Sequence, residues 1–485
     1  MKEHVTQIMK KLEEILDPTR PIADIISDLS ISSVDVPAWK DLSTEYDPML
    51  HEIVEDKTSR KDRDRSDGVR DKAARIPFGM EMLFSERLAE FMFVNPVRRD
   101  YSSDGSDVSL EVQKALEYVY EHARIDSVNM ERATSYFASC QNVTFWYAKK
   151  KPNDYYGFHS EYKIKCKTFS PMDDYEFYPM LDDDDLEAMS FSYSQKEGND
   201  TINFFETFTN ELHMLWRQGN GTDWEEVDND DIYINNEQLK MMPLIYMYSK
   251  RSAFYGLHPI VRDNEYAHSE DSDTISYNAS PVLAVNGKLS GEPMKKGEPR
   301  RVYRTEAGGK VEYVSWNQSV EAVDHHEKFN LKMMFMLARV PDISFETLAG
   351  IGNIGYDAMQ TMLTDVMLKC GRESLPFIQA FDREFNVVRE ILKVILPDKI
   401  KTAWSAALDK ITCKHNITLF SIKSFTQQVT DLTTANGGQP IMSQRESIQR
   451  LGISKDVDAT ISDINSEAQE RSKNNITDIL NPTSE

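Results

Sequence analysis

A glycine-rich loop between two helical patterns is the feature that most constrains the fold of this chain. Apolar residues recur at helical spacing from Val320 to Ala338, and a second helical pattern begins near Met359. The loop between them, residues 341–355, starts with a proline, which cannot continue a helix, and contains three glycines, which permit tight or left-handed backbone. Ordinary helix connections are shorter and more polar. The loop is therefore either a connector packed against a neighbour or a tip that contacts a moving ligand.

The length and charge of the chain narrow its functional class. It has 485 residues, enough for two or more domains, with 40% hydrophobic residues and a net charge of −24. A protein this acidic does not adhere broadly to nucleic acids or membranes, because such adhesion needs a basic surface. A duplex can still pass close to it without binding tightly.

The cysteines and the termini bear on the cellular compartment. Cys140, Cys166, Cys370 and Cys413 are too far apart to form a zinc or redox motif, so we expect buried thiols in a reducing environment. The N-terminus lacks the apolar core of a signal peptide, and no apolar run reaches membrane-spanning length. We therefore expect a protein that is cytosolic or assembled inside a cell.

Periodicity predicts an α+β protein. Helices are expected over residues 6–16, 80–94, 108–122, from 126, 257–280, 319–340, from 356 to about 396 with a kink at Pro376, and 443–480. Strands are expected over residues 142–147, 175–178, 188–193, 202–208, 211–217, 282–285 and 417–425. The strands between 160 and 250 should form an antiparallel meander closed by 242–246, and 301–304 should form a hairpin with 310–314. The charged run over 55–75 is expected to be solvated.

One basic island stands out in this acidic chain. Its basic residues are Lys288, Lys295, Lys296, Arg300, Arg301, Arg304 and Lys310. A docking surface for an acidic partner or a phosphate backbone would need such a reversal of sign. The alternative is a hairpin that its charges keep soluble.

No sequence motif points to catalysis. The chain has no phosphate loop, no nucleophile elbow and no His-Glu-x-x-His motif. His325 and His326 are adjacent, so on a helix they point in different directions and cannot share a metal ion. The four acids from Asp182 to Asp185 can bind a hard cation, although a solvated turn is the simpler interpretation. We expect no enzymatic activity, no cofactor and no metal site, with a metal-dependent hydrolase built on these acids as an alternative.

The order of these elements resembles the portal proteins of tailed bacteriophages, in the SPP1-like portal group, from about Met80 to Leu480. The matching stretches are Phe84 to Val97, Asp126 to Tyr147, Met242-Pro243-Leu244-Ile245-Tyr246, Asp342-Ile343-Ser344 with Gly350, Gly352 and Gly355-Tyr356-Asp357-Ala358-Met359, and Ile441 to Ser447 with Leu451-Gly452. The sequence departs from the family at two turns. Asn95-Pro96-Val97 and Ser139-Cys140-Gln141 stand where the family usually has glycine or another small residue.

The resemblance implies a portal fold with seven parts. These are an N-terminal arm and wing (1–256, helices and the meander), a first stem helix (257–280), an α/β clip (281–318), a second stem helix (319–340), a tunnel loop (341–355), a long kinked helix with a return to the wing (356–440) and a helical crown (441–485).

The resemblance also implies a function without catalysis. Portal proteins form a ring, dodecameric in capsids, at one vertex of the virion, assembled in the host cytoplasm, through which double-stranded DNA enters during packaging and leaves during ejection. The implied partners are other copies of the chain, the DNA, the terminase large subunit, the neck or head-completion adaptor, and the major capsid and scaffolding proteins, but no membrane. A helical scaffold or adaptor without a DNA role remains an alternative.

The site residues follow from the same resemblance. The tunnel loop would face the DNA with Asp342, Ile343, Ser344, Phe345, Glu346, Leu348, Gly350, Ile351, Gly352, Asn353 and Gly355. This loop has two acids and no basic residue, so it would contact the duplex without holding it. The basic island would lie in the clip and dock the partners through Lys288, Lys295, Lys296, Arg300, Arg301 and Arg304. Acids of the first stem helix, such as Glu265, Asp271 and Asp273, are expected in the channel lumen.

Overall fold

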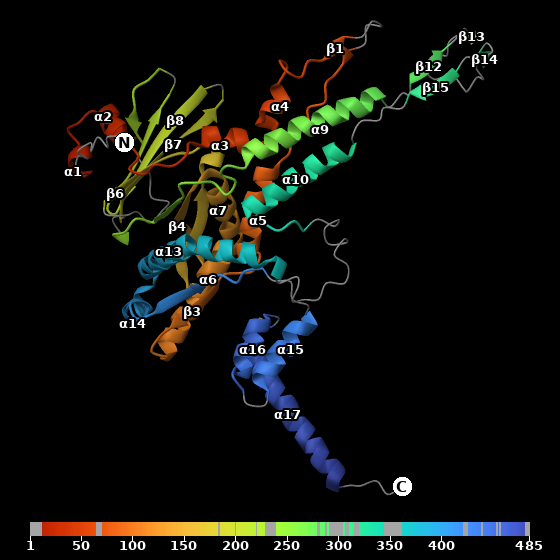
Figure 1. Ribbon diagram of the computed structural model, residues 1–485. Helices are drawn as coiled ribbons and strands as arrows, with labels where there is room; N and C mark the ends of the chain where they lie inside the picture. Colours follow the sequence, from red (N-terminus) through yellow and green to blue (C-terminus); the bar gives the residue numbers. More distant parts are fainter. Residues whose placement is uncertain are drawn as a thin grey trace. The chain divides into compact units, whose positions relative to one another are not determined.

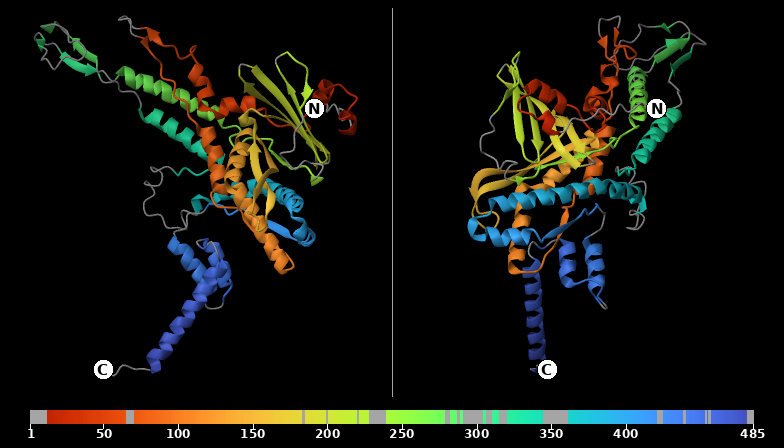
Figure 2. Two further views of the ribbon diagram at one scale, coloured as in Figure 1. Left: turned by 180° about the vertical axis from the view of Figure 1, so that it is seen from behind. Right: turned by 90° about the vertical axis from the view of Figure 1, so that its left-hand side faces the viewer.

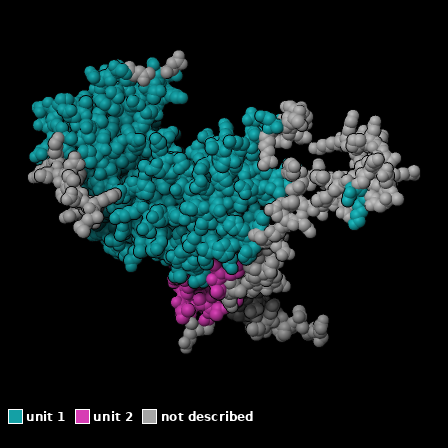
Figure 3. Space-filling model, turned by 45° about the horizontal axis from the view of Figure 1, so that its top comes forward, with its two compact units in different colours: residues 1–347, 364–420 teal, residues 348–363, 421–485 magenta. Residues whose placement is uncertain are grey.

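The chain forms two compact units in the computed structural model (Figure 3). One comprises Met1–Thr347 with Thr364–Phe420, and the other comprises Leu348–Leu363 with Ser421–Glu485. The structure describes residues 12–64, 70–182, 185–198, 200–219, 221–227, 239–278, 282–286, 289–290, 304–305, 310–314, 320–343, 361–420, 425–437, 440–452, 454 and 457–480.

Two antiparallel sheets form most of the β structure of the first unit (Figure 1). The larger sheet is a meander with the strand order β10-β9-β8-β7-β6, and the smaller has β4 between β5 and β11. The strands are β4 (Gln141–Asn153), β5 (Ser160–Phe169), β6 (Glu176–Asp182), β7 (Asp185–Glu197), β8 (Asp200–Thr209), β9 (His213–Gln218), β10 (Glu225–Glu226) and β11 (Leu244–Tyr248). The predicted α+β class and the meander are therefore confirmed.

The prediction that residues 242–246 close the meander is wrong. β11 pairs with β4 instead, with Leu244 opposite Phe145. Four of the five residues of β11 are buried, so both of its faces need cover. The smaller sheet lies between the meander and a layer of helices, so a strand in it is covered on both faces. The edge strand of the meander, β10, is exposed and would not give β11 such cover.

The alternation of side chains along the strands builds a core on each face of the meander. On β7, Met189 and Phe191 pack toward the smaller sheet, while Ala188 packs on the opposite face. On β8, Phe208 packs toward the smaller sheet and Phe205 packs on the opposite face. Two N-terminal helices, α1 (Leu12–Ile15) and α2 (Ile22–Leu29), supply the apolar cover for that opposite face.

A layer of helices covers the other face of the smaller sheet (Figures 1 and 2). It contains α5 (Met80–Phe93), α6 (Asp107–Ala123), α7 (Ile125–Ser139) and α13 (Thr364–Ile395), which includes Pro376 as predicted. Helices α3 (Trp39–Tyr46) and α14 (Asp398–Leu408) and the short helix η2 (Pro171–Asp173) pack around this layer. An ion pair between Arg132 of α7 and Glu384 of α13, 2.8 Å long, joins two fully buried side chains.

Cys140 takes the backbone conformation of a glycine at the Ser139-Cys140-Gln141 turn, one of the two turns where the sequence departs from the family pattern. It has φ 63°, in the left-handed region that favours glycine, at the turn from α7 into β4. Burial raises the pKa of its thiol to about 12, and the same holds for Cys370. All four cysteines are free, with Cys166 and Cys413 only partly buried, so the prediction of buried thiols holds for two of them.

A two-stranded ribbon returns the chain to the start of the helical layer. β16 (Thr412–Asn416) pairs with β3 (Arg98–Ser102) over five residues. The predicted strand at 417–425 is wrong in position, because residues 417–420 have no regular structure and a helix begins at Phe425. Strand propensity decides less than the presence of a partner edge, and among the residues that the structure describes β3 pairs with residues 412–416.

Helices α9 (His258–Asn278) and α10 (Val320–Ala338) run side by side, at the positions predicted for the two stem helices (Figures 1 and 2). Two nested strand pairs lie between them in the sequence: β12 (Val282–Asn286) with β15 (Lys310–Val314), and β13 (Leu289–Ser290) with β14 (Arg304–Thr305). The predicted hairpin of 301–304 with 310–314 is therefore wrong. The pairing with β12 gives β15 a ladder of five residues, which the short β14 cannot match.

The second unit is helical in its described part. It contains α15 (Phe425–Asn436), α16 (Gln444–Leu451) and α17 (Val457–Leu480). Ser443 caps the start of α16, and Gly452 ends it with φ 71°. The predicted polar helix over 443–480 thus consists of two helices. Across the described residues of both units, no helix has the combination of length and apolar character that a membrane span needs.

Candidate functional site

Most of the site residues predicted from the sequence lie outside the described residues. This applies to 344–355 of the predicted tunnel loop and to Lys288, Lys295, Lys296, Arg300 and Arg301 of the basic island. Asp342 and Ile343 follow α10 and are half-buried. Arg304 is described in its backbone, which pairs with Ser290.

The predicted cation site of the hydrolase alternative lies where β6 ends and β7 begins. Asp182 and Asp185 are the last paired residues of β6 and β7, and the two acids between them lie outside the described residues.

Three side chains on one face of α9 hold the chain that leads into α5. They are spaced four residues apart on the helix. Each accepts one hydrogen bond from a backbone N–H of the neighbouring segment, and the three N–H groups belong to alternate residues of that segment. The pairs are Phe78 with Glu265 at 2.7 Å, Ile76 with Ser269 at 3.0 Å and Ala74 with Asp273 at 2.8 Å. Four helical residues advance about 6 Å, and two extended residues advance about 6.6 Å, so the two spacings match. We call these three hydrogen bonds the α9 ladder.

Arg60 adds to the contact between this segment and α9, and Arg75 supports the segment from within. Arg60 is 7% exposed and donates to the carbonyl oxygens of Ser269 and Ala74, at 3.0 and 2.8 Å, beside its ion pair with Asp273. Arg75 donates to the carbonyl oxygen of Arg60 at 2.6 Å. A guanidinium has five N–H donors, so it can satisfy several carbonyl groups of an irregular segment.

The segment that contains these arginines has little regular structure. It includes η1 (Pro48–Leu50), α4 (Glu52–Glu55) and the two-residue strands β1 (Arg63–Asp64) and β2 (Arg70–Asp71). The prediction that residues 55–75 are simply solvated is wrong for Arg60 and Arg75. Composition does not distinguish a charge that faces water from one that serves buried carbonyl groups.

A buried histidine shares Glu265 with the ladder. His51 is 1% exposed, and its Nδ1 lies 2.6 Å from Glu265 Oε1 while its Nε2 lies 2.8 Å from the carbonyl oxygen of Glu45. Burial alone would lower the pKa of His51, but the hydrogen bonds to Glu265 and to the Glu45 carbonyl raise it overall. Since both ring nitrogens face acceptors, the imidazolium form, which donates from both, fits this site.

Polar contacts also join α9 to α10. Asp263 accepts from Asn330 at 2.8 Å and pairs with His326 at 2.9 Å, and His268 lies 3.3 Å from Glu327. The His326 side chain is 51% exposed, as expected for a surface histidine. These contacts fix α10 against a helix that the ladder already holds.

The ladder corrects the prediction that acids of the first stem helix face a lumen. Glu265 is 1% exposed and points into its own chain. Asp273 pairs with Arg60 and accepts from Ala74. Asp271 is only partly buried. The i, i+4, i+8 spacing of Glu265, Ser269 and Asp273 was visible in the sequence, but nothing local identified the backbone segment that they bind.

Apolar side chains on α10 remain uncovered by the described residues of the chain. Phe329 is 54% exposed, Met336 56% and Leu337 50%. Large apolar side chains gathered on one helix mark a surface that another protein can cover.

Comparison with known proteins gives a family match over most of the chain. A family model described as "Phage portal protein, SPP1 Gp6-like" matches residues 31–474. The comparison with curated proteins finds no match.

Among the solved structures that the chain resembles are three at low identity. The neck of a native gene transfer agent particle, computed with C12 symmetry, is 11% identical with a TM-score of 0.36 and covers 89% of this chain and 98% of its own. The neck of an empty particle, computed with C6 symmetry, is 11% identical with a TM-score of 0.36, and the match covers 83% of this chain and 94% of that chain. The virion of a native particle is 12% identical with a TM-score of 0.32, and the match covers 77% of this chain and 89% of that chain. These TM-scores are too low to add weight to the family match.

The α9 ladder generates a stability prediction. Glu265→Ala should lower the free energy of unfolding by roughly 2–6 kcal/mol, because it leaves the buried Nδ1 of His51 and the Phe78 N–H without their partner. Denaturant unfolding measures the loss, and hydrogen exchange should show faster exchange over residues 74–78. Glu270→Ala, at an exposed position of the same helix, is the control and should change stability by less than about 0.5 kcal/mol. Equal stability of the two variants would refute the role of the ladder.

Proposed function

Because the chain belongs to the SPP1 Gp6-like family of phage portal proteins, we propose that it forms the portal ring of a tailed phage or a phage-like particle. The observation that carries this proposal is the family match over residues 31–474. The family is structural and not enzymatic. In the proposed function, double-stranded DNA enters the capsid through the ring during packaging and leaves through it during ejection.

The parts of the portal are assigned to the observed elements. The two sheets and the helical layer would form the wing, α9 and α10 the stem, the paired strands within 281–318 the clip, and α15 to α17 the crown, with residues 341–355 as the tunnel loop. The mixed architecture of helices and antiparallel sheets is consistent with a portal fold. At 1.5 Å per residue, the 21 residues of α9 span about 31 Å and the 19 of α10 about 28 Å, lengths that suit a stem.

A duplex that slides needs weak contact with the channel. Lysine and arginine contacts to phosphate release counterions and hold DNA. The tunnel loop has no basic residue, and the whole chain carries a net charge of −24. Both features support a channel that guides DNA without binding it tightly.

Ring formation would use the uncovered side of the stem. Phe329, Met336 and Leu337 expose large apolar surfaces on α10, and in a ring the neighbouring copy can cover them. The proposed ring is a dodecamer at one capsid vertex of the virion, assembled in the host cytoplasm among the major capsid and scaffolding proteins. The clip would bind the terminase large subunit during packaging and the neck or head-completion adaptor afterwards.

Negative-stain microscopy of the purified full-length protein tests the ring. We expect rings with a central channel for the unmodified protein and none for Met336→Glu with Leu337→Glu, because a ring would bury two added charges in an apolar contact. Leu212→Glu, which places an acid at a comparably exposed leucine between β8 and β9, should still form rings. A small compact particle or an open assembly from the unmodified protein would contradict the proposed ring.

The tunnel loop is tested by stiffening it. Gly350→Pro with Gly352→Pro should block DNA packaging or retention while rings still form, because proline fixes φ where glycine leaves it free. Packaged DNA is measured as nuclease-resistant DNA per particle, and microscopy reports assembly. Normal packaging by the double variant would show that the loop is only a connector.

The clip proposal predicts an electrostatic contact. Arg300→Glu with Arg301→Glu should weaken binding of the terminase large subunit to purified rings by at least about tenfold, as expected when close charge pairs become repulsive. Lys149→Glu with Lys150→Glu makes the same change of charge at exposed positions of β4 and should leave binding unchanged. If both double variants bind like the unmodified ring, the basic island does not dock this partner.

A further inference from the structure

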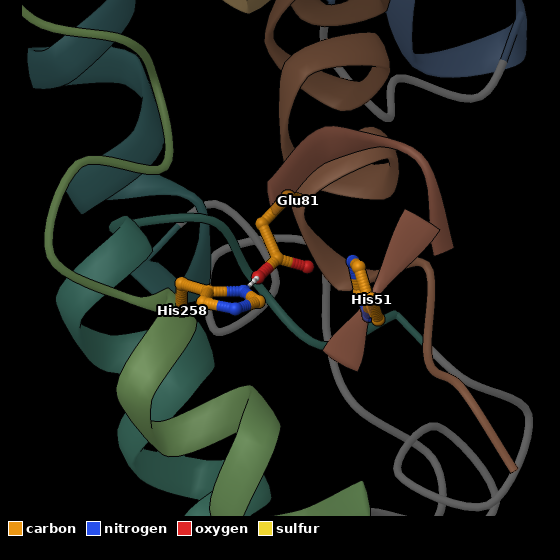
Figure 4. Close-up of side chains that lie close together, drawn as sticks. All are labelled: His51, Glu81 and His258. Atoms are coloured by element: carbon orange, nitrogen blue, oxygen red, sulfur yellow. Dashed lines mark hydrogen bonds and ion pairs between the residues drawn. The ribbon is translucent and has the colours of Figure 1, made fainter. Parts of the chain in front are cut away.

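Three side chains from distant parts of the sequence meet where the N-terminal segment, α5 and α9 come together (Figure 4). His51 precedes α4, Glu81 lies in the first turn of α5, and His258 is the first residue of α9. One ligand atom of each residue lies within 4.8 Å of those of the other two. Among the described residues, this is the one such group of histidine, cysteine and acidic side chains.

The carboxylate of Glu81 has an oxygen atom without a protein partner. The residue is 0% exposed, and its Oε1 accepts from His258 Nδ1 at 2.9 Å. Its Oε2 is buried and has no hydrogen-bond partner among the described residues, and in Figure 4 the carboxylate lies between the two imidazole rings. A buried carboxylate oxygen without a partner is costly, so an additional ligand at this position would remove a real cost.

We propose that His51, Glu81 and His258 bind one divalent transition-metal ion of the zinc type. Two imidazole nitrogens and one carboxylate oxygen form a three-ligand set that Zn²⁺ accepts, with water as the fourth ligand. Ca²⁺ and Mg²⁺ prefer oxygen ligands alone and fit poorly. In a tetrahedral site with bonds of about 2.1 Å, ligand atoms lie about 3.4 Å apart, so movements on the order of 1 Å would close the present cluster around an ion.

The surroundings of His51 provide the outer contacts that such a site needs. Its two ring nitrogens contact Glu265 and the Glu45 carbonyl, at 2.6 and 2.8 Å. An ion would displace the proton of one nitrogen into solvent, while the other nitrogen keeps its hydrogen bond. A carboxylate or backbone carbonyl in that position orients metal-binding histidines in general.

An acidic surface pocket offers a route for a cation. The pocket is lined by His51 itself and by Glu52, Glu55 and Asp56. Carboxylates at the mouth of a pocket raise the local concentration of cations. Because Glu265 contacts both His51 and the ladder, a bound ion would strengthen the junction that positions α9.

Metal binding by the tag-free, full-length protein tests the proposal. After removal of metals with a chelator, the protein should bind one Zn²⁺ per chain, and Co²⁺ in its place should give the visible absorption bands of a tetrahedral site. Zn²⁺ should also raise the thermal melting temperature, because the ion binds the folded state. Glu81→Gln should weaken Zn²⁺ binding by about 100-fold or more.

Two further variants keep the test decisive. His258→Gln changes a partly exposed ligand and should weaken binding even if Glu81→Gln does not fold. His268→Gln changes a histidine of the same helix that pairs with Glu327, and it should bind Zn²⁺ like the unmodified protein. The proposal fails if the unmodified protein shows no saturable binding at micromolar Zn²⁺, or if the ligand variants bind as tightly as His268→Gln.

Discussion

The placement of α9 depends on a match between the rise of a helix and the rise of an extended chain. Glu265, Ser269 and Asp273 repeat along α9 at nearly the spacing of alternate backbone N–H groups in residues 74–78. A shift by one residue would turn these N–H groups away and leave buried acceptors unpaired. The ladder therefore fixes where α9 lies relative to the segment that leads into α5, and α10 is then placed through Asp263 and His268.

Buried acids play a structural role in this acidic chain. Glu384 pairs with Arg132 inside the helical layer, Glu265 pairs with His51, and Glu81 contacts His258. Such pairs add little net stability over apolar packing, but losing one partner is severe. They therefore penalise wrong registers between helices more than they strengthen the correct one.

Local patterns predicted the helices well and the partners poorly. The apolar repeat found the residues of α5, α6 and α10, because burial on one helix face leaves a period in the sequence. The partners of β11, β15 and β16 were missed, because pairing depends on which strand edge remains free after folding. The contacts of the arginines of the 55–75 run and the cluster of His51, Glu81 and His258 were missed for a related reason. Their partners are distant in the sequence, and no spacing signals them.

The ladder also changes how the charge of the proposed channel is understood. Two of the three acids expected in the lumen, Glu265 and Asp273, bind their own chain. The net charge of −24 therefore overstates how many acids can face a duplex. Strong repulsion would hinder entry of DNA as much as strong attraction would hinder its release. In the proposed channel, part of the acidic side chains would be buried within each subunit, and the tunnel loop would offer no basic residue. The electrostatic field on the DNA would then be weak, neither strongly attractive nor strongly repulsive, which is what sliding requires.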